Sequence, residues 1–144
     1  MRLIENKKLH LTYVITSSLE AGIELFGFEV KSLRNKQGSL DGARIIVRGG
    51  EAFIVGSYIP PYQPSNTPKG YDPYRTRRLL LRKDEVAELA AIEHAKSLTL
   101  APHSLYLKKT HIKCDVALCK KKNARDKRED IKRDISRREL RDSV

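Results

Sequence analysis

The chain has 144 residues, enough for one domain or for one domain and a tail. Its 29 Lys and Arg against 18 Asp and Glu give a formal net charge of +11, which favours nucleic acid or an anionic membrane surface as partner. No apolar run approaches the roughly 18–20 residues of a spanning helix, and the first residues turn polar too early for a secretory signal. We therefore expect a cytoplasmic protein that does not span a membrane.

The first ten residues are charged, and they predict a flexible arm or a short helix. Asn6, Lys7 and Lys8 carry side chains that often contact phosphates, although a solvated terminus explains them equally well.

The next segment predicts a strand and then a short helix. Residues 12–19 are rich in Thr, Tyr, Val, Ile and Ser, and the residues that follow alternate apolar and polar, as a half-buried strand would. Gly27 breaks this alternation, and Val30 and Leu33 fit one side of a helix. Glu29 lies among apolar neighbours, where an unpaired carboxylate is costly to bury. We expect Glu29 either at the surface or held by a partner.

Two glycines predict a hairpin. Residues 43–48 and 51–59 are rich in β-forming residues and flank Gly49 and Gly50, which can both take the positive φ of a tight turn. The second strand should end at Ile59, because the prolines that follow have no N–H for a ladder.

Residues 60–74 contain five of the six prolines and predict a surface loop. Tyr62, Tyr71 and Tyr74 lie in it, with Lys69 and Arg75 nearby. Aromatic and basic residues on a loop suit stacking on unpaired bases, but the tyrosines could instead pack against the domain and hold the loop down.

The second half predicts a strand, a helix and a strand pair. Three leucines at 79–81 read as the end of a buried strand, with Arg75, Arg77 and Arg78 at its exposed end. Apolar residues then repeat every third position from Val86 to about residue 96, which predicts a helix. Residues 98–107 and 112–118 form the last two strands. Five or six strands suit a mainly β fold such as a small closed barrel of the oligonucleotide-binding (OB) type with peripheral helices, although the strand count alone does not separate this barrel from others.

The cysteines and histidines do not predict a site. Cys114 and Cys119 are five apart, so a strand places them on opposite faces, and we expect reduced thiols, no zinc and no cofactor. Cys119 with His103 or His111 is a conceivable nucleophile–base pair, but nothing near them predicts activation. We expect no enzyme activity.

The last 25 residues, 120–144, are a basic tail with eleven Lys or Arg against six Asp or Glu. This segment lacks aromatic residues and has few apolar ones, so we expect it to be disordered alone. Its composition favours helix formation on a partner that supplies phosphates, although a charge run is often only a solvated face.

Four segments resemble, in order, the SsrA-binding protein family (small protein B, SmpB), which binds transfer-messenger RNA. They are NKK at 6–8 with Tyr13, EAGIELFGFEVKSLR at 20–34, DPYRTRRLLL at 72–81 and DKR at 126–128. The resemblance implies an OB-like RNA-binding barrel over 1–119 and a tail over 120–144 that becomes helical on the ribosome.

The resemblance also implies a function and a set of sites. The chain would be a non-catalytic, monomeric adaptor that binds the tRNA-like domain of transfer-messenger RNA and delivers it to stalled ribosomes for trans-translation. The implied RNA-binding residues are Asn6, Lys7, Lys8, Glu29, Lys31, Ser32, Arg34, Lys69, Arg75, Arg77 and Arg78. The tail residues implied to enter the decoding centre and messenger channel of the small subunit are Lys120, Lys121, Lys122, Arg125, Asp126, Lys127, Arg128 and Lys132. The alternative is a general RNA-binding barrel, such as a ribosomal protein or an RNA chaperone.

Overall fold

The computed structural model describes residues 1–96 and 98–122. Within these ranges the strands are β1 (Arg2–Glu5), β2 (Tyr13–Ile23), β3 (Arg44–Arg48), β4 (Glu51–Val55), β5 (Arg77–Leu80), β6 (Thr99–Lys108) and β7 (His111–Lys121). The helices are α1 (Leu9–Thr12), α2 (Gly27–Arg34) and α3 (Lys83–Ala95), with a 3-10 turn η1 (Pro64–Asn66) in the loop before β5. The mainly β fold expected from the sequence is confirmed.

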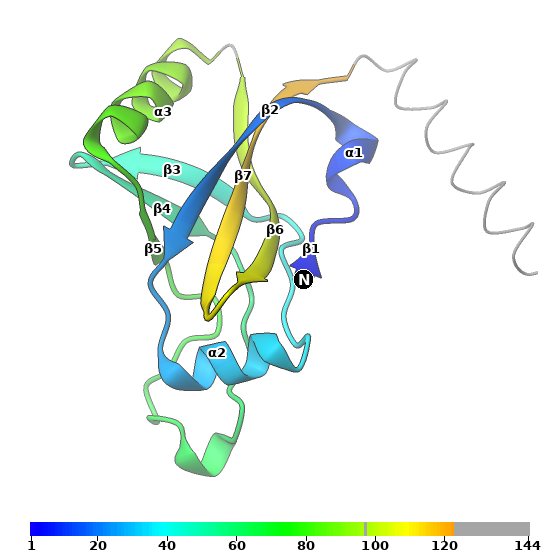
Figure 1. The fold of residues 1–144 in the computed structure, drawn as a ribbon, viewed down its shortest axis with the longest axis vertical. Helices are drawn as coiled ribbons and strands as arrows, with labels where there is room; N and C mark the ends of the chain where they lie inside the picture. The colour runs from blue at the N-terminus through cyan, green and yellow to red at the C-terminus, as the bar shows by residue number, and fades with distance from the viewer. Residues whose placement is uncertain (97, 123–144) are drawn as a thin grey trace, which may run out of the picture.

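The seven described strands form one antiparallel, strongly twisted sheet in the order β1-β6-β7-β2-β5-β4-β3 (Figure 1). This order has two ends, β1 and β3, so the closed barrel of the sequence prediction is not confirmed. β3 nevertheless lies near β6, and α3 packs against both strands. Glu93 of α3 accepts the outward N–H of Val47 through Oε2 at 2.8 Å, so the helix covers the edge of β3.

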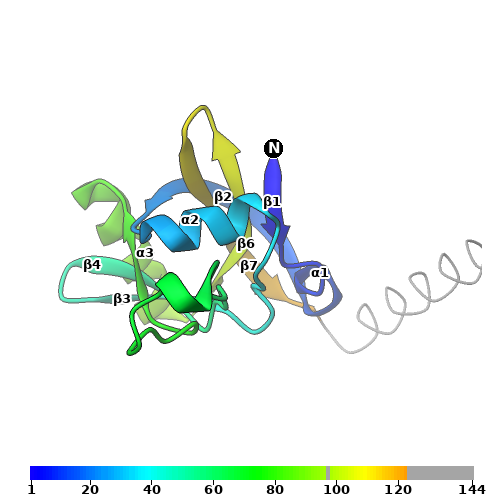
Figure 2. The same cartoon turned by 90° about the horizontal axis from the view of Figure 1, so that it is seen from below.

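The two longer helices lie at different ends of the molecule. α2 lies across the end of the sheet that carries the 60–74 loop, whereas α3 lies toward the opposite end (Figures 1 and 2). Val86 and Leu89 of α3 are buried, as the apolar repeat predicts. No described helix is long and apolar enough to cross a membrane.

The hairpin around the two glycines is confirmed, with Arg48 opposite Glu51 and Gly49 and Gly50 at φ 59° and 76°. Its second strand ends at Val55 and not at Ile59, since Gly56 takes φ 82° and leaves the ladder.

The N-terminus differs from its prediction as a flexible arm or a short helix. Residues 2–5 are a strand that pairs with β6, and only α1 beyond them is a short helix. Leu3 and Ile4 are 4% and 8% exposed and join the main core. The segment is ordered because two adjacent apolar side chains find a buried position, which charge content alone does not indicate.

The core has two parts on the two faces of β7. Cys114 belongs to the main cluster, whereas Cys119 packs with Leu9, Ala101 and Ala117 in a smaller one. The opposite facing of the two cysteines is confirmed, and both thiols are free and buried. Burial raises the pKa of the Cys114 thiol to about 12.

Candidate nucleic-acid interface

Glu29, in the first turn of α2, is fully buried, with 0% of its side chain exposed. Arg75 donates to both carboxylate oxygens, from Nη2 to Oε1 at 2.5 Å and from Nε to Oε2 at 3.0 Å. Arg77 donates to Oε2 from Nε at 2.9 Å and from Nη2 at 2.7 Å. The Phe26 amide donates to Oε1 at 2.7 Å and so caps the helix. Glu29 is therefore held by partners, one of the two arrangements that its sequence context allowed.

These contacts set the charge state of Glu29. Burial alone would raise the pKa of its carboxyl group, but the hydrogen bonds from Arg75, the Phe26 amide and Arg77 outweigh burial and hold the pKa below its ordinary value of 4.5. The carboxylate is thus negative at neutral pH and balances part of the charge of two guanidinium groups.

Arg77 is also fully buried, although the sequence predicted it at the exposed end of β5. Its Nη1 donates to the carbonyl and the hydroxyl of Ser57, at 3.1 and 2.9 Å, and its Nη2 donates to the carbonyl of Pro73 at 3.0 Å. A buried guanidinium is tolerated here because Glu29 and these oxygens satisfy its N–H groups.

Tyr71 completes the Glu29 cluster, by which we mean Glu29, Tyr71, Arg75 and Arg77. Its hydroxyl lies 2.7 Å from the Ile59 carbonyl and 2.9 Å from Oε2 of Glu29, and it accepts from Nη2 of Arg77 at 3.0 Å. Burial and the neighbouring carboxylate raise the pKa of Tyr71 to about 12. Of the two alternatives for the loop tyrosines, packing therefore holds for Tyr71.

Two more predicted contact residues are turned inward. Ser32 is buried and donates to the Pro60 carbonyl at 2.6 Å, which ties α2 to the loop. Asn6 is buried on the other side of the domain, where its amide donates to the Pro102 carbonyl at 3.4 Å. Asn6, Glu29, Ser32 and Arg77 therefore lie beneath the surface, and their polar groups bond within the chain. Their RNA contact, which the resemblance implied, stays a prediction.

The remaining predicted contact residues of the domain reach solvent. Lys7, Lys8, Lys31, Arg34 and Lys69 are exposed, and Arg75 and Arg78 are partly exposed. Arg78 pairs with Glu24 at 3.0 Å and Glu51 at 3.2 Å.

Aromatic rings lie beside these cations. The guanidinium carbon of Arg75 lies 4.2 Å from the centroid of the Phe26 ring, which is 50% exposed, and Phe28 stacks on Phe26 at 5.5 Å between centroids. The ammonium of Lys31 lies 5.9 Å from the ring of Tyr62, which is also exposed. Sequence reasoning missed Phe26, since only the fold brings it to Arg75. An exposed ring next to a guanidinium can stack on an unpaired base.

A family model described as SmpB protein matches residues 3–144. The chain belongs to the SmpB protein family. The SsrA-binding protein of Mesoplasma florum is 44% identical over 137 residues, which cover 94% of this chain and 92% of that protein. The SsrA-binding protein of Burkholderia vietnamiensis is 39% identical over 142 residues, which cover 98% of this chain and 96% of that protein.

A solved structure also resembles this member of the SmpB family. It is described as "tmRNA-SmpB: a journey to the center of the bacterial ribosome", and its chain superposes with a TM-score of 0.72 at 34% identity. The superposition covers 91% of this chain and 95% of that chain.

The predicted tail, residues 120–144, begins inside the sheet. Lys120 and Lys121 end β7 opposite Val14 and Tyr13, and the Lys122 amide donates to the Thr12 carbonyl at 2.9 Å. The other predicted tail residues lie outside the described residues: Arg125, Asp126, Lys127, Arg128 and Lys132.

Within residues 1–96 and 98–122, no group of three or more His, Cys, Asp or Glu side chains could hold a metal ion. The ring nitrogens of His103 each face one carboxylate, Nδ1 at 3.3 Å from Asp115 and Nε2 at 3.7 Å from Glu5.

Proposed function

We propose that this protein is an RNA-binding adaptor that binds the tRNA-like domain of transfer-messenger RNA and delivers it to stalled ribosomes for trans-translation. The observation that carries the proposal is the likeness, over nine-tenths of the chain, to a structure whose description names tmRNA, SmpB and the bacterial ribosome. The names of the relatives agree with it.

The RNA contact is proposed for the surface around α2 and the 60–74 loop. Lys31, Arg34 and Lys69 present exposed cations there, and Arg75 with Phe26 presents a cation beside an exposed ring. Cations neutralise phosphates, and rings and guanidinium planes stack on unpaired bases. This arrangement fits a folded RNA with exposed loops better than a plain duplex.

The buried residues are proposed to shape this surface and not to touch RNA. Glu29 and Arg77 hold Arg75 and the loop in place through the contacts of the Glu29 cluster, and Ser32 fastens the loop to α2. A preorganised cation loses less side-chain entropy on binding than a free one.

The rest of the assignment concerns the whole chain. We propose a division into a barrel-like domain over 1–119 and a tail over 120–144, with the tail entering the decoding centre and messenger channel of the small subunit and becoming helical there. The protein would act as a monomer in the cytoplasm, with the ribosome supplying the catalysis. In the OB-like barrel that we propose, α3 would close the sheet by packing across β3 and β6.

Competition between RNAs tests this function. The full chain, bound to a labelled tRNA-like domain of transfer-messenger RNA, is challenged with unlabelled copies of the same domain or with bulk tRNA. We expect the specific domain to compete at far lower concentration than bulk tRNA. Equal competition would support the alternative, a general RNA-binding protein, because the net charge of +11 alone attracts any RNA.

A further inference from the structure

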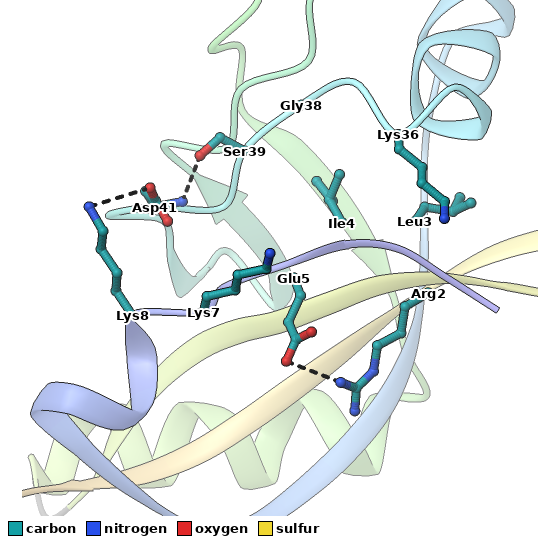
Figure 3. A pocket seen from close by; sticks show the side chains of 10 residues that line it. All are labelled: Arg2, Leu3, Ile4, Glu5, Lys7, Lys8, Lys36, Gly38, Ser39 and Asp41. Carbon is teal, nitrogen blue, oxygen red and sulfur yellow. Dashed lines mark hydrogen bonds and ion pairs between the residues drawn. The ribbon is translucent and has the colours of Figure 1, made fainter. Parts of the chain in front are cut away.

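A hollow of about 490 Å³ lies between β1 and the connection from α2 to β3. One wall is β1 with the residues just after it, and the other is formed by residues 36–41 (Figure 3). Leu3 and Ile4 lie at its base, anchored in the core. We call this hollow the β1 groove.

The charges that line the β1 groove do not balance. Arg2 pairs with Glu5 at 3.0 Å, and Lys8 lies 4.0 Å from Asp41, which uses both carboxylates of the lining. Lys7 and Lys36 are left with no ion-pair partner among the described residues. Lys36 reaches from the loop toward β1, and Lys7 extends from the segment after β1 (Figure 3). Two unpaired ammonium groups therefore face one hollow from separate segments.

The backbone at Lys36 is unusual for a lysine. Its φ is 59°, in the left-handed region that a residue with a Cβ enters at a cost of about 1 kcal/mol and glycine enters freely. The position follows the end of α2, where the Lys36 amide donates to the Leu33 carbonyl at 2.8 Å. Glycine would serve the backbone better here, and the turn itself does not require a lysine at this position.

The wall that carries Lys36 is rigid. Ser39 and Tyr58 exchange two backbone hydrogen bonds of 2.9 Å each. Gly38 has φ 139°, and a Cβ at this position would lie 2.8 Å from the Tyr58 carbonyl oxygen, so no other residue fits without a shift. The backbone that carries Lys36 is thus fixed at the rim of the groove by contacts within the chain.

We infer that the β1 groove binds a phosphate of the RNA backbone, with Lys36 and Lys7 as its ammonium donors. The identification of the ligand as RNA rests on the proposed function. Ammonium groups act as compact point charges on phosphates, and a further exposed cation, Arg34 at the end of α2, precedes Lys36 by two positions. The groove extends the RNA contact from the 60–74 loop to the N-terminal strand and adds Lys36, which sequence reasoning did not select.

The chain supplies a matched control for this site. Lys96 also has a left-handed backbone, with φ 56°, but it ends α3, away from α2 (Figure 1). Lys36→Gly and Lys96→Gly remove the same charge and relieve the same backbone strain. Neither variant should lower the melting temperature, so a loss of binding cannot be ascribed to unfolding.

The test measures the dissociation constant of the full chain for a labelled tRNA-like domain over a series of KCl concentrations. Lys36→Gly should weaken binding several-fold and reduce the slope of log K against log salt by about 1, as the loss of one phosphate contact does. Lys96→Gly should leave both quantities nearly unchanged. If both lysines hold one phosphate, the double variant Lys7→Ala/Lys36→Gly should lose less binding free energy than the sum of the losses measured for Lys7→Ala and for Lys36→Gly alone.

Three results would overturn the inference. The first is an unchanged affinity of Lys36→Gly for RNA, and the second is an equal loss of affinity in Lys36→Gly and Lys96→Gly. The third is a weaker binding of a polyglutamate peptide by Lys36→Gly, with no change in its binding of RNA. The last would assign the groove to acidic protein. The same titrations with bulk tRNA separate this inference from the proposed function. A wild-type chain without preference between the RNAs defeats that function, whereas the difference between the two variants still reports on the groove.

Discussion

The buried charge of Glu29 is stable only because two arginines, Arg75 and Arg77, surround it. Moving a carboxylate out of water is unfavourable, and hydrogen-bonded guanidinium groups at 2.5–3.0 Å offset that loss. Removing Glu29 leaves Arg77 buried without a counter-ion. The fold therefore depends on the complete Glu29 cluster more than on the strength of any one contact.

Glu29→Gln should lower the free energy of unfolding by about 3 kcal/mol, because Arg77 stays buried and loses its counter-ion. Urea denaturation followed by circular dichroism measures this. Glu24→Gln removes an exposed partner of Arg78 and is the control, with an expected change within about 0.5 kcal/mol. Equal effects of the two variants would show that Glu29 contributes no more than a surface charge.

The pH dependence of stability should show the same residue. Because the folded pKa of Glu29 lies below its ordinary value of 4.5, its contribution is present above that value and is lost as the pH falls through the folded pKa. Wild type should therefore lose its advantage over Glu29→Gln on acidification below about pH 5. A constant difference between the two proteins at neutral and acidic pH would contradict the lowered pKa.

β1 makes the N-terminal segment a part of the sheet. As a strand at one end of the sheet, it pairs with β6, supplies Leu3 and Ile4 to the core and forms one wall of the β1 groove. The RNA contacts that the family resemblance implied for Lys7 and Lys8 would thus start from an anchored segment and not from a flexible arm. Anchoring reduces the entropy lost when these lysines bind.

Leu3→Ala should lower the free energy of unfolding by about 2–3 kcal/mol, as buried leucines commonly do. Arg2→Ala, at the exposed neighbouring position, should change it by no more than about 0.5 kcal/mol. Thermal or urea unfolding distinguishes the two. If both variants unfold like wild type, the N-terminal segment does not pack on β6 in solution.

In the whole molecule, the net positive charge is unevenly distributed along the chain. Residues 1–122 carry 21 Lys or Arg against 12 Asp or Glu, whereas residues 123–144 carry eight against six. Most of the net charge that attracts RNA therefore belongs to the domain. The residues that follow Lys122 add little to long-range attraction, so a separate role for them must lie in specific contacts.

Truncation after Lys122 should leave the affinity for the tRNA-like domain within a few-fold of wild type and abolish peptide tagging on stalled ribosomes. The cut spares Lys120 and Lys121, which pair with β2. Binding titrations and an in vitro tagging assay measure the two quantities. Full tagging by the truncated protein would remove the role proposed for the tail, and a large loss of affinity would place the tail in the RNA contact.

Local structure and the family resemblance could be predicted from the sequence. The glycine pair specified the β3–β4 hairpin, Gly27 marked the start of α2, and the odd spacing of Cys114 and Cys119 placed them on opposite faces of β7. These features depend on backbone conformation and side-chain period, which neighbouring residues settle.

The burial of particular charges could not be predicted, because it depends on contacts between distant segments. Arg75 and Arg77 lie 46 and 48 positions from Glu29, and no local pattern indicates that they converge on it. Contacts between distant segments likewise determine that residues 2–5 form an ordered strand, that Asn6 and Ser32 point inward, and that Lys36 has no ion-pair partner among the described residues. Sequence patterns report the preferences of a residue and its neighbours, whereas burial depends on what the rest of the chain brings to the same place.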